Sequence, residues 1–187
     1  MPPKDSKETL ALDSATDVFT RYGYARTTMG DIAARAGMSR PALYLLFPDK
    51  QAAFDRVIGR MDRLKLEEIA AALPALDGLE ERLLHACLSW GLHGAELAAA
   101  HPDAADLFDL RFASVRQVYA NFQDLIAGLI APALAEAGLD ATADEMARAF
   151  VYGMRGLLAT AADPADLRRL LTVQVKVLAR ALRDKRG

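Results

Sequence analysis

Apolar residues recur every three or four positions along nearly the whole chain, and no useful length shows strand-like alternation. The spacing predicts an all-α protein of about nine helices. Three short helices are expected first, over residues 9–22, 28–37 and 39–47. A longer fourth helix follows Asp49 and carries the apolar stripe Phe54, Val57, Ile58, Met61, Leu64 and Ile69. Five more helices are expected over 79–100, 103–110, 113–137, 142–162 and 164–185.

Residues that start or stop helices place the boundaries. Gly23 is expected to end the first helix in a left-handed conformation. Thr28, with Asp31 three residues later, resembles a capping box at the start of the second helix. Pro74 and the Asp77-Gly78 pair are expected to end the fourth helix.

The stretch "AARAGMSRPALY" places two short helices on either side of a tight turn. Ala33 is small where the helices must approach, and Gly37 allows the sharp turn. Met38 is expected to fill the junction, Ser39 to cap the next helix, and Leu43 to point into the core. This pattern predicts a helix-turn-helix, in which one helix holds another in the DNA major groove. A generic pair of hairpin helices can share the same spacing.

The second of these helices presents its outward side chains at its N-terminal end. Of these, Arg40 is the one able to make a bidentate contact with guanine. The outward residues are Ser39, Arg40, Pro41, Ala42 and Tyr44.

Composition and charge narrow the class of protein. The 187 residues are 52% hydrophobic and 26% charged, which is typical of one ordinary or two small globular domains. The single cysteine, Cys87, excludes an intramolecular disulfide, and no metal or cofactor site is expected. No apolar run approaches the length of a membrane span, and "MPPKDSKE" lacks the apolar core of a signal peptide, so we expect a cytoplasmic protein. Residues 1–60 carry 9 Lys and Arg against 7 Asp and Glu, a weak basic bias that suits a polyanionic partner.

From Ala15 to Phe54 the chain resembles the N-terminal domain of the tetracycline-repressor (TetR) family. The resemblance rests on matches in register at Phe19, Gly23, Thr28, Ile32, Ala33, Ala36, Gly37, Ser39, Leu43, Tyr44, Phe47 and Lys50. It implies a DNA-binding domain of three helices over 1–50 and a helical effector-binding and dimerisation domain over 51–187. The implied function is a ligand-responsive transcriptional regulator, most simply a dimeric repressor released from a palindromic operator by a small molecule.

The resemblance also implies roles for individual residues. Thr28, Tyr44 and Lys50 would contact DNA phosphates, while Arg40, Pro41 and Ala42 would face base edges or sugars. The family usually has His or an aromatic residue just before the Phe, but this chain has Leu46 there. DNA binding is therefore expected either to be weaker or to depend more on Arg26 and Arg35.

The second half has no motif of its own. The resemblance implies an effector pocket, and sparse polar residues favour an apolar effector. Arg155 is expected to pair with an acidic ligand group, with Asp109 or with Glu145. An ordinary hydrophobic core explains the same aromatic stripe. The candidate pocket residues are His85, Leu88, Trp90, His93, Phe108, Phe112, Tyr119, Phe122, Phe150, Tyr152, Met154 and Arg155.

The last two helices have apolar stripes that suit a four-helix bundle formed by two copies. The candidate interface residues are Met146, Phe150, Leu157, Leu167, Leu171 and Leu178. A monomer that buries these stripes internally is the alternative.

Two further functions stay open: a family member that activates transcription or lacks a small ligand, and a helical enzyme. The enzyme alternative is weak because no nucleophile–base pair, metal cluster or glycine-rich phosphate loop is evident.

Overall fold

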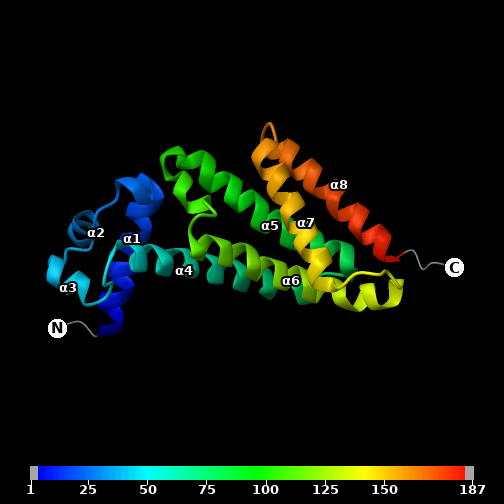
Figure 1. Cartoon of the computed structure of the whole chain (residues 1–187), viewed down its shortest axis with the longest axis horizontal. Coiled ribbons are helices and arrows are strands. Elements are labelled where there is room, and N and C mark those ends of the chain that lie inside the picture. Colours follow the sequence, from blue (N-terminus) through cyan, green and yellow to red (C-terminus); the bar gives the residue numbers. More distant parts are fainter. Residues whose placement is uncertain (1–3, 184–187) are drawn as a thin grey trace. The chain divides into compact units, whose positions relative to one another are not determined.

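The computed structural model describes residues 4–183 and confirms the all-α prediction. Eight α-helices and two 3-10 helices make up the regular structure of these residues. They are α1 (Lys4–Arg26), α2 (Met29–Arg35), α3 (Arg40–Tyr44), α4 (Lys50–Ala72), η1 (Leu73–Ala75), α5 (Gly78–Ala100), η2 (Pro102–Phe108), α6 (Ala113–Ala137), α7 (Ala143–Thr160) and α8 (Pro164–Arg183) (Figure 1).

Internal contacts divide the chain into two compact units. The first contains the residues up to Arg63 together with Ala98–Val118, and the second contains Leu64–Leu97 and the chain from Tyr119 onward. These units are not contiguous in sequence, because α4, α5 and α6 each contribute residues to both. The assignment of DNA binding to residues 1–50 and of effector binding and dimerisation to residues 51–187 stays a prediction.

An aromatic cluster forms the centre of the first unit. The ring of Tyr24 lies 5.0 Å from Phe54 and 4.8 Å from Phe112, measured between centroids, and Phe19 lies 5.2 Å from Phe54. Such edge-to-face pairs add to the gain from apolar burial. Phe112 follows η2, so residues distant in sequence from the short helices complete their core.

Gly23 kinks α1 near its end. The helix starts at Lys4, earlier than expected, and continues past the kink to Arg26. Gly23 has φ 72° and ψ 172°, which side-chain-bearing residues rarely adopt. A Cβ atom here would also lie 2.5 Å from the carbonyl oxygen of Asp103. Two features therefore require glycine at position 23: the positive φ of its backbone and the close approach of η2 to α1.

Ring stacking joins α5 to α6 in the second unit. Trp90 stacks on Phe122 with centroids 4.5 Å apart, and Tyr119 meets Trp90 edge-on at 5.3 Å. Gly91 permits close packing of α5 against α8, since an added Cβ would lie 3.0 Å from Cδ1 of Leu171.

Helices α7 and α8 pack side by side (Figure 1). Gln174 of α8 donates a hydrogen bond to the carbonyl oxygen of Phe150 at 2.9 Å. Gly153 makes room for this amide, because an added Cβ would lie 2.7 Å from its nitrogen.

Two segments differ from expectation. The predicted helix over 103–110 is the 3-10 helix η2, which opens with Pro102 and has a non-helical residue, Ala104, inside it. Helix α6 is long and apolar enough, by length and composition, to cross a membrane, whereas the sequence pattern predicted no such stretch. One such helix is weak evidence of a span, because helices that pack into a protein core have the same composition.

Candidate nucleic-acid interface

Thr28 starts α2 with the capping box expected from the sequence. The backbone N–H of Asp31 donates to Oγ1 of Thr28 at 3.2 Å, and the N–H of Thr28 donates to the Asp31 carboxylate at 2.8 Å. The Thr28 hydroxyl also donates to that carboxylate, at 2.7 Å. These hydrogen bonds lower the pKa of Asp31. Asp31 therefore holds a negative charge at a helix N-terminus, where it is favoured.

The turn between α2 and α3 is fixed by short-range bonds. Gly37 has φ 62°, and the N–H of Met38 donates to the carbonyl oxygen of Ala33 at 2.9 Å. Ser39 is the N-cap of α3, and its hydroxyl accepts from the N–H of Ala42 at 3.3 Å. Leu43 is fully buried. The tight turn, the N-cap and the inward leucine are as predicted.

The side chains of α3 that were expected to face outward are accessible. Ser39, Arg40, Pro41 and Tyr44 are exposed, and Ala42 is half-buried. The guanidinium of Arg40 lies against Gly30 of α2, in a space that an alanine Cβ would fill. Sequence reasoning missed Leu45, whose side chain is 88% exposed at the end of α3. An apolar residue at this helix end would ordinarily be assigned to the core, so only the structure identifies it.

Lys50 is engaged within the first unit. Its ammonium donates to the carbonyl oxygen of Tyr24 at 2.9 Å and lies 4.2 Å from the centre of the Tyr24 ring. Lys50 therefore ties the start of α4 to the end of α1. Burial, with the nearby Asp49 and Asp55 carboxylates, raises the pKa of Tyr24.

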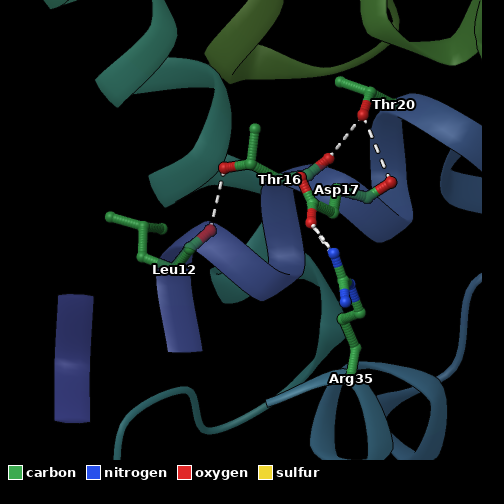
Figure 2. A network of polar contacts seen from close by, with 5 residues as sticks. All are labelled: Leu12, Thr16, Asp17, Thr20 and Arg35. Carbon is green, nitrogen blue, oxygen red and sulfur yellow. Dashed lines mark hydrogen bonds and ion pairs between the residues drawn. The ribbon is translucent and has the colours of Figure 1, made fainter. Parts of the chain in front are cut away.

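The two arginines expected to compensate for Leu46 both form ion pairs with carboxylates of the same chain. Figure 2 shows Arg35 of α2 reaching Asp17 of α1, with Nη2 2.5 Å from a carboxylate oxygen. On the same helix face the hydroxyls of Thr16 and Thr20 donate back to main-chain carbonyl oxygens one turn earlier (Figure 2). Arg26 pairs with Asp103 of η2 at 2.6 Å.

The candidate effector residues are divided between the two units. Phe108 and Phe112 belong to the first unit, where the Phe112 ring packs against Tyr24, and their place in an effector pocket stays a prediction. In the second unit Phe122, Phe150, Tyr119 and Met154 are buried, His85, Leu88 and Trp90 are half-buried, and His93, Tyr152 and Arg155 are exposed.

Polar groups of the second unit gather beside Trp90 on α5 and beside Tyr119 on α6. Arg155 hydrogen-bonds the side chain of Tyr119, and this contact partly offsets the burial that raises the pKa of Tyr119. Partial desolvation, followed by the positive charge of Lys65, lowers the pKa of His93. Lys65 itself pairs with Glu68 at 2.7 Å and was not among the expected residues.

The candidate dimer residues are only partly available. Phe150, Leu167 and Leu171 are buried within the single chain, so they have no surface to offer a partner. The helical period correctly identified an apolar face of each helix, but that face packs inside the chain itself. Met146, Leu157 and Leu178 are half-buried. The exposed large apolar side chains of α7 and α8 are instead Tyr152, Val173 and Val177.

Comparison with known proteins identifies the helix-turn-helix region. Residues 11–57 match the family model described as "Bacterial regulatory proteins, tetR family". The "Uncharacterized HTH-type transcriptional regulator YfiR" of Bacillus subtilis is 38% identical over 55 residues, which are 29% of this chain and 27% of that protein. The "HTH-type transcriptional repressor ComR" of Escherichia coli is 30% identical over 87 residues, 46% of this chain and 40% of that protein. The matches thus span less than half the length of these relatives.

The fold matches solved regulators over almost the entire chain. The transcriptional regulator FadR from Bacillus subtilis, solved in complex with stearoyl-CoA, has a TM-score of 0.69 over 92% of this chain and 98% of that chain, at 17% identity. At this identity the similarity concerns the fold alone. The family model describes regulatory proteins, so the enzyme alternative is set aside. Since the family match coincides with the capped α2, the tight turn and the exposed face of α3, residues 11–57 form a helix-turn-helix region of the kind found in bacterial regulatory proteins of the TetR family.

Proposed function

We propose that this chain is a cytoplasmic, dimeric, ligand-responsive transcriptional repressor that binds a palindromic DNA operator. The observation that carries the proposal is the exposed N-terminal half of α3, held by a buried Leu43 and a capped turn. That arrangement fits a helix that enters the major groove with its N-terminal end first. Residues 1–50 would form the DNA-binding domain, and 51–187 would bind the effector and the second copy.

Each exposed group of α3 has a role in this proposal. Arg40 would make a bidentate contact with guanine, the most common specific contact of arginine in the major groove. Pro41 and Ala42 would face bases or sugars, and Ser39 would keep the helix end ordered. Tyr44 and Thr28 would contact phosphates, which fix the position of the protein without reading sequence. Lys50 would contact a phosphate only by leaving the Tyr24 carbonyl.

Dimerisation would use the outer face of α7 and α8. Tyr152, Val173 and Val177 are 44%, 52% and 64% exposed there. Apolar side chains of this size on adjacent helices fit a four-helix bundle made by two copies. A two-fold dimer matches a palindromic operator, whose half-sites lie about 34–36 Å apart on successive major grooves.

The effector would be a small, mainly apolar molecule bound by the second unit. The aromatic residues Trp90, Tyr119 and Phe122, which pack against one another there, support this class. FadR, of similar fold, was solved with stearoyl-CoA. An effector releases DNA only to the extent that it binds the DNA-free state more tightly than the DNA-bound state.

Selection of randomised DNA by the purified protein tests the proposal, followed by footprinting of the enriched site. We expect a palindrome with half-sites about one helical turn apart, and affinity that falls steeply with salt. Arg40→Ala should weaken operator binding by about 1–3 kcal/mol while the circular dichroism stays unchanged. Failure to enrich any site would contradict the proposal as a whole. Retained affinity in the Arg40 variant would contradict only the assigned role of Arg40.

A further inference from the structure

The segment from Asp103 to Asp106 of η2 is bonded directly to the end of α1. The carbonyl oxygen of Asp103 lies against Gly23, where a Cβ atom would come within 2.5 Å of it. The carboxylate of Asp106 accepts the backbone N–H of Ala25 at 3.0 Å. Two independent contacts therefore fix the position of η2 against the last turn of α1.

This anchoring places the Asp103 carboxylate beside Arg26. The Nη2 atom of Arg26 lies 2.6 Å from Oδ2 of Asp103. The two side chains are 57% and 63% exposed, so water and competing ions reach both. Exposed ion pairs of this kind are weak and exchange readily.

Arg26 also lies next to a proposed phosphate contact. It precedes Thr27, whose hydroxyl donates to the carbonyl oxygen of Gly23 at 2.6 Å and is buried. Thr28, the N-cap of α2, follows directly. The short, hydrogen-bonded connection keeps the base of Arg26 close to Thr28, the proposed phosphate contact.

Other cations near the helix-turn-helix are also engaged. The ammonium of Lys50 binds the Tyr24 carbonyl, and Arg35 binds Asp17. The Arg35 pair joins α2 to α1, which directly precedes it in the chain. The Arg26 pair differs, because its acid comes from η2, which lies between α5 and α6 in the chain.

We infer that Arg26 is a phosphate-binding residue and that Asp103 competes with DNA phosphate for it. This inference rests on the proposed DNA-binding function and adds a negative regulator of affinity to it. When the protein binds DNA, the guanidinium exchanges the Asp103 carboxylate for a phosphate oxygen. A displacement of η2 that separates the pair raises the affinity for DNA, since Arg26 then has no competing carboxylate.

A double-mutant cycle on the full-length protein tests the inference, with Arg26→Gln, Asp103→Asn and the combined variant. The Kd for the selected operator duplex is measured by fluorescence anisotropy at several salt concentrations. Asp103→Asn should tighten binding about two- to five-fold, the range expected when an exposed ion pair no longer opposes binding. Arg26→Gln should weaken binding and reduce the slope of log Kd against log salt by about 0.9 for each DNA-binding head, hence by about 1.8 for a dimer on a palindromic operator. In the Arg26→Gln background, Asp103→Asn should have no effect.

Asp109→Asn is the matched control. It removes the same charge from the residue that directly follows η2, but Asp109 pairs with Arg111. Equal tightening by the Asp109 variant, or tightening by Asp103→Asn that persists without Arg26, would show a general charge effect and overturn the inference. Unchanged affinity in Asp103→Asn would overturn it as well. If the unmodified protein binds no operator, the proposed function itself fails, which is a distinct result. Circular dichroism of each variant confirms that the fold is retained.

Discussion

The ammonium of Lys50 lies 2.9 Å from the carbonyl oxygen of Tyr24 and above the ring of the same residue. One side chain thereby satisfies a carbonyl at the end of α1 and fixes the start of α4. A residue that the family resemblance places on DNA has a structural partner in the free protein. Its contributions to stability and to DNA binding can be measured separately.

Lys50→Gln should lower the free energy of unfolding by about 1–3 kcal/mol, because it removes a charged hydrogen bond and a cation–π contact. Urea denaturation measures this change. The exposed Lys176 of α8 provides the control, and Lys176→Gln should change stability by less than about 0.5 kcal/mol. If Lys50 also binds phosphate, its variant reduces the salt dependence of operator binding. An unchanged salt slope would assign Lys50 a structural role alone.

Gly23→Ala should destabilise the protein by about 2–4 kcal/mol, since it combines an unfavourable positive φ with a backbone clash. The clash is with Asp103, so the contact of η2 with α1 should be lost first. Gly59→Ala is the control, because Gly59 lies inside α4 and its added Cβ has no neighbour within 4 Å. That variant should gain about 0.5–1 kcal/mol from helix propensity. Equal thermal midpoints for the two variants would contradict the requirement for glycine at position 23.

Thr28 and Thr142 start α2 and α7 with the same capping box. Only Thr28 lies in the proposed DNA interface, so variants of the two residues distinguish an effect on stability from an effect on DNA binding. In each, the backbone N–H and the hydroxyl of the threonine donate to an acid three residues later. Thr28→Ala and Thr142→Ala should each cost about 1 kcal/mol of stability. Only Thr28→Ala should weaken operator binding beyond what the loss of folded protein explains. Calorimetry and anisotropy on both variants make the comparison, and equal operator affinities would remove Thr28 from the interface.

His93 should make stability depend on pH. Its pKa in the folded protein is lowered below 6.5 by partial desolvation and by Lys65. Between the folded and unfolded pKa values the unfolded chain binds more protons, so stability rises with pH there. The contribution of neutral His93 to the free energy of unfolding is complete above about pH 6.5. It is lost as the pH falls toward the pKa of His93 in the folded protein. Proton NMR titration of His93 gives that pKa directly. His93→Gln should remove this part of the change in thermal midpoint between pH 5 and about pH 7, and an identical pH profile would contradict the assignment.

Cys87 should be inert in the folded protein. It is fully buried in α5, and burial raises the pKa of its thiol far above the ordinary value. The thiolate is the reactive form, so a disulfide reagent at about pH 8 should label the native protein only at the rate of unfolding. Labelling should be complete at once in guanidinium chloride. Fast labelling without denaturant would show that α5 opens locally.

The helical period and the capping residues allowed much of the fold to be predicted. Thr28 with Asp31, Ser39 with Ala42, and the breaks near Pro74 depend on residues a few positions apart. Such local signals act in the isolated sequence, and they also gave the helix-turn-helix and its outward residues. The period showed that Leu167 and Leu171 lie on an apolar face. It gave no information on whether that face packs inside one chain or against another.

What the sequence determined by itself is therefore the all-α class, the capped helices and the resemblance of the N-terminal region to the TetR family. The tertiary structure alone decided which distant residues meet. It placed Phe112 among the aromatic rings of the first unit, Asp103 beside Arg26, and Lys50 on the Tyr24 carbonyl. These contacts join residues 26–88 positions apart. No local pattern specifies them, because they form only when burial of the whole apolar surface brings the helices together.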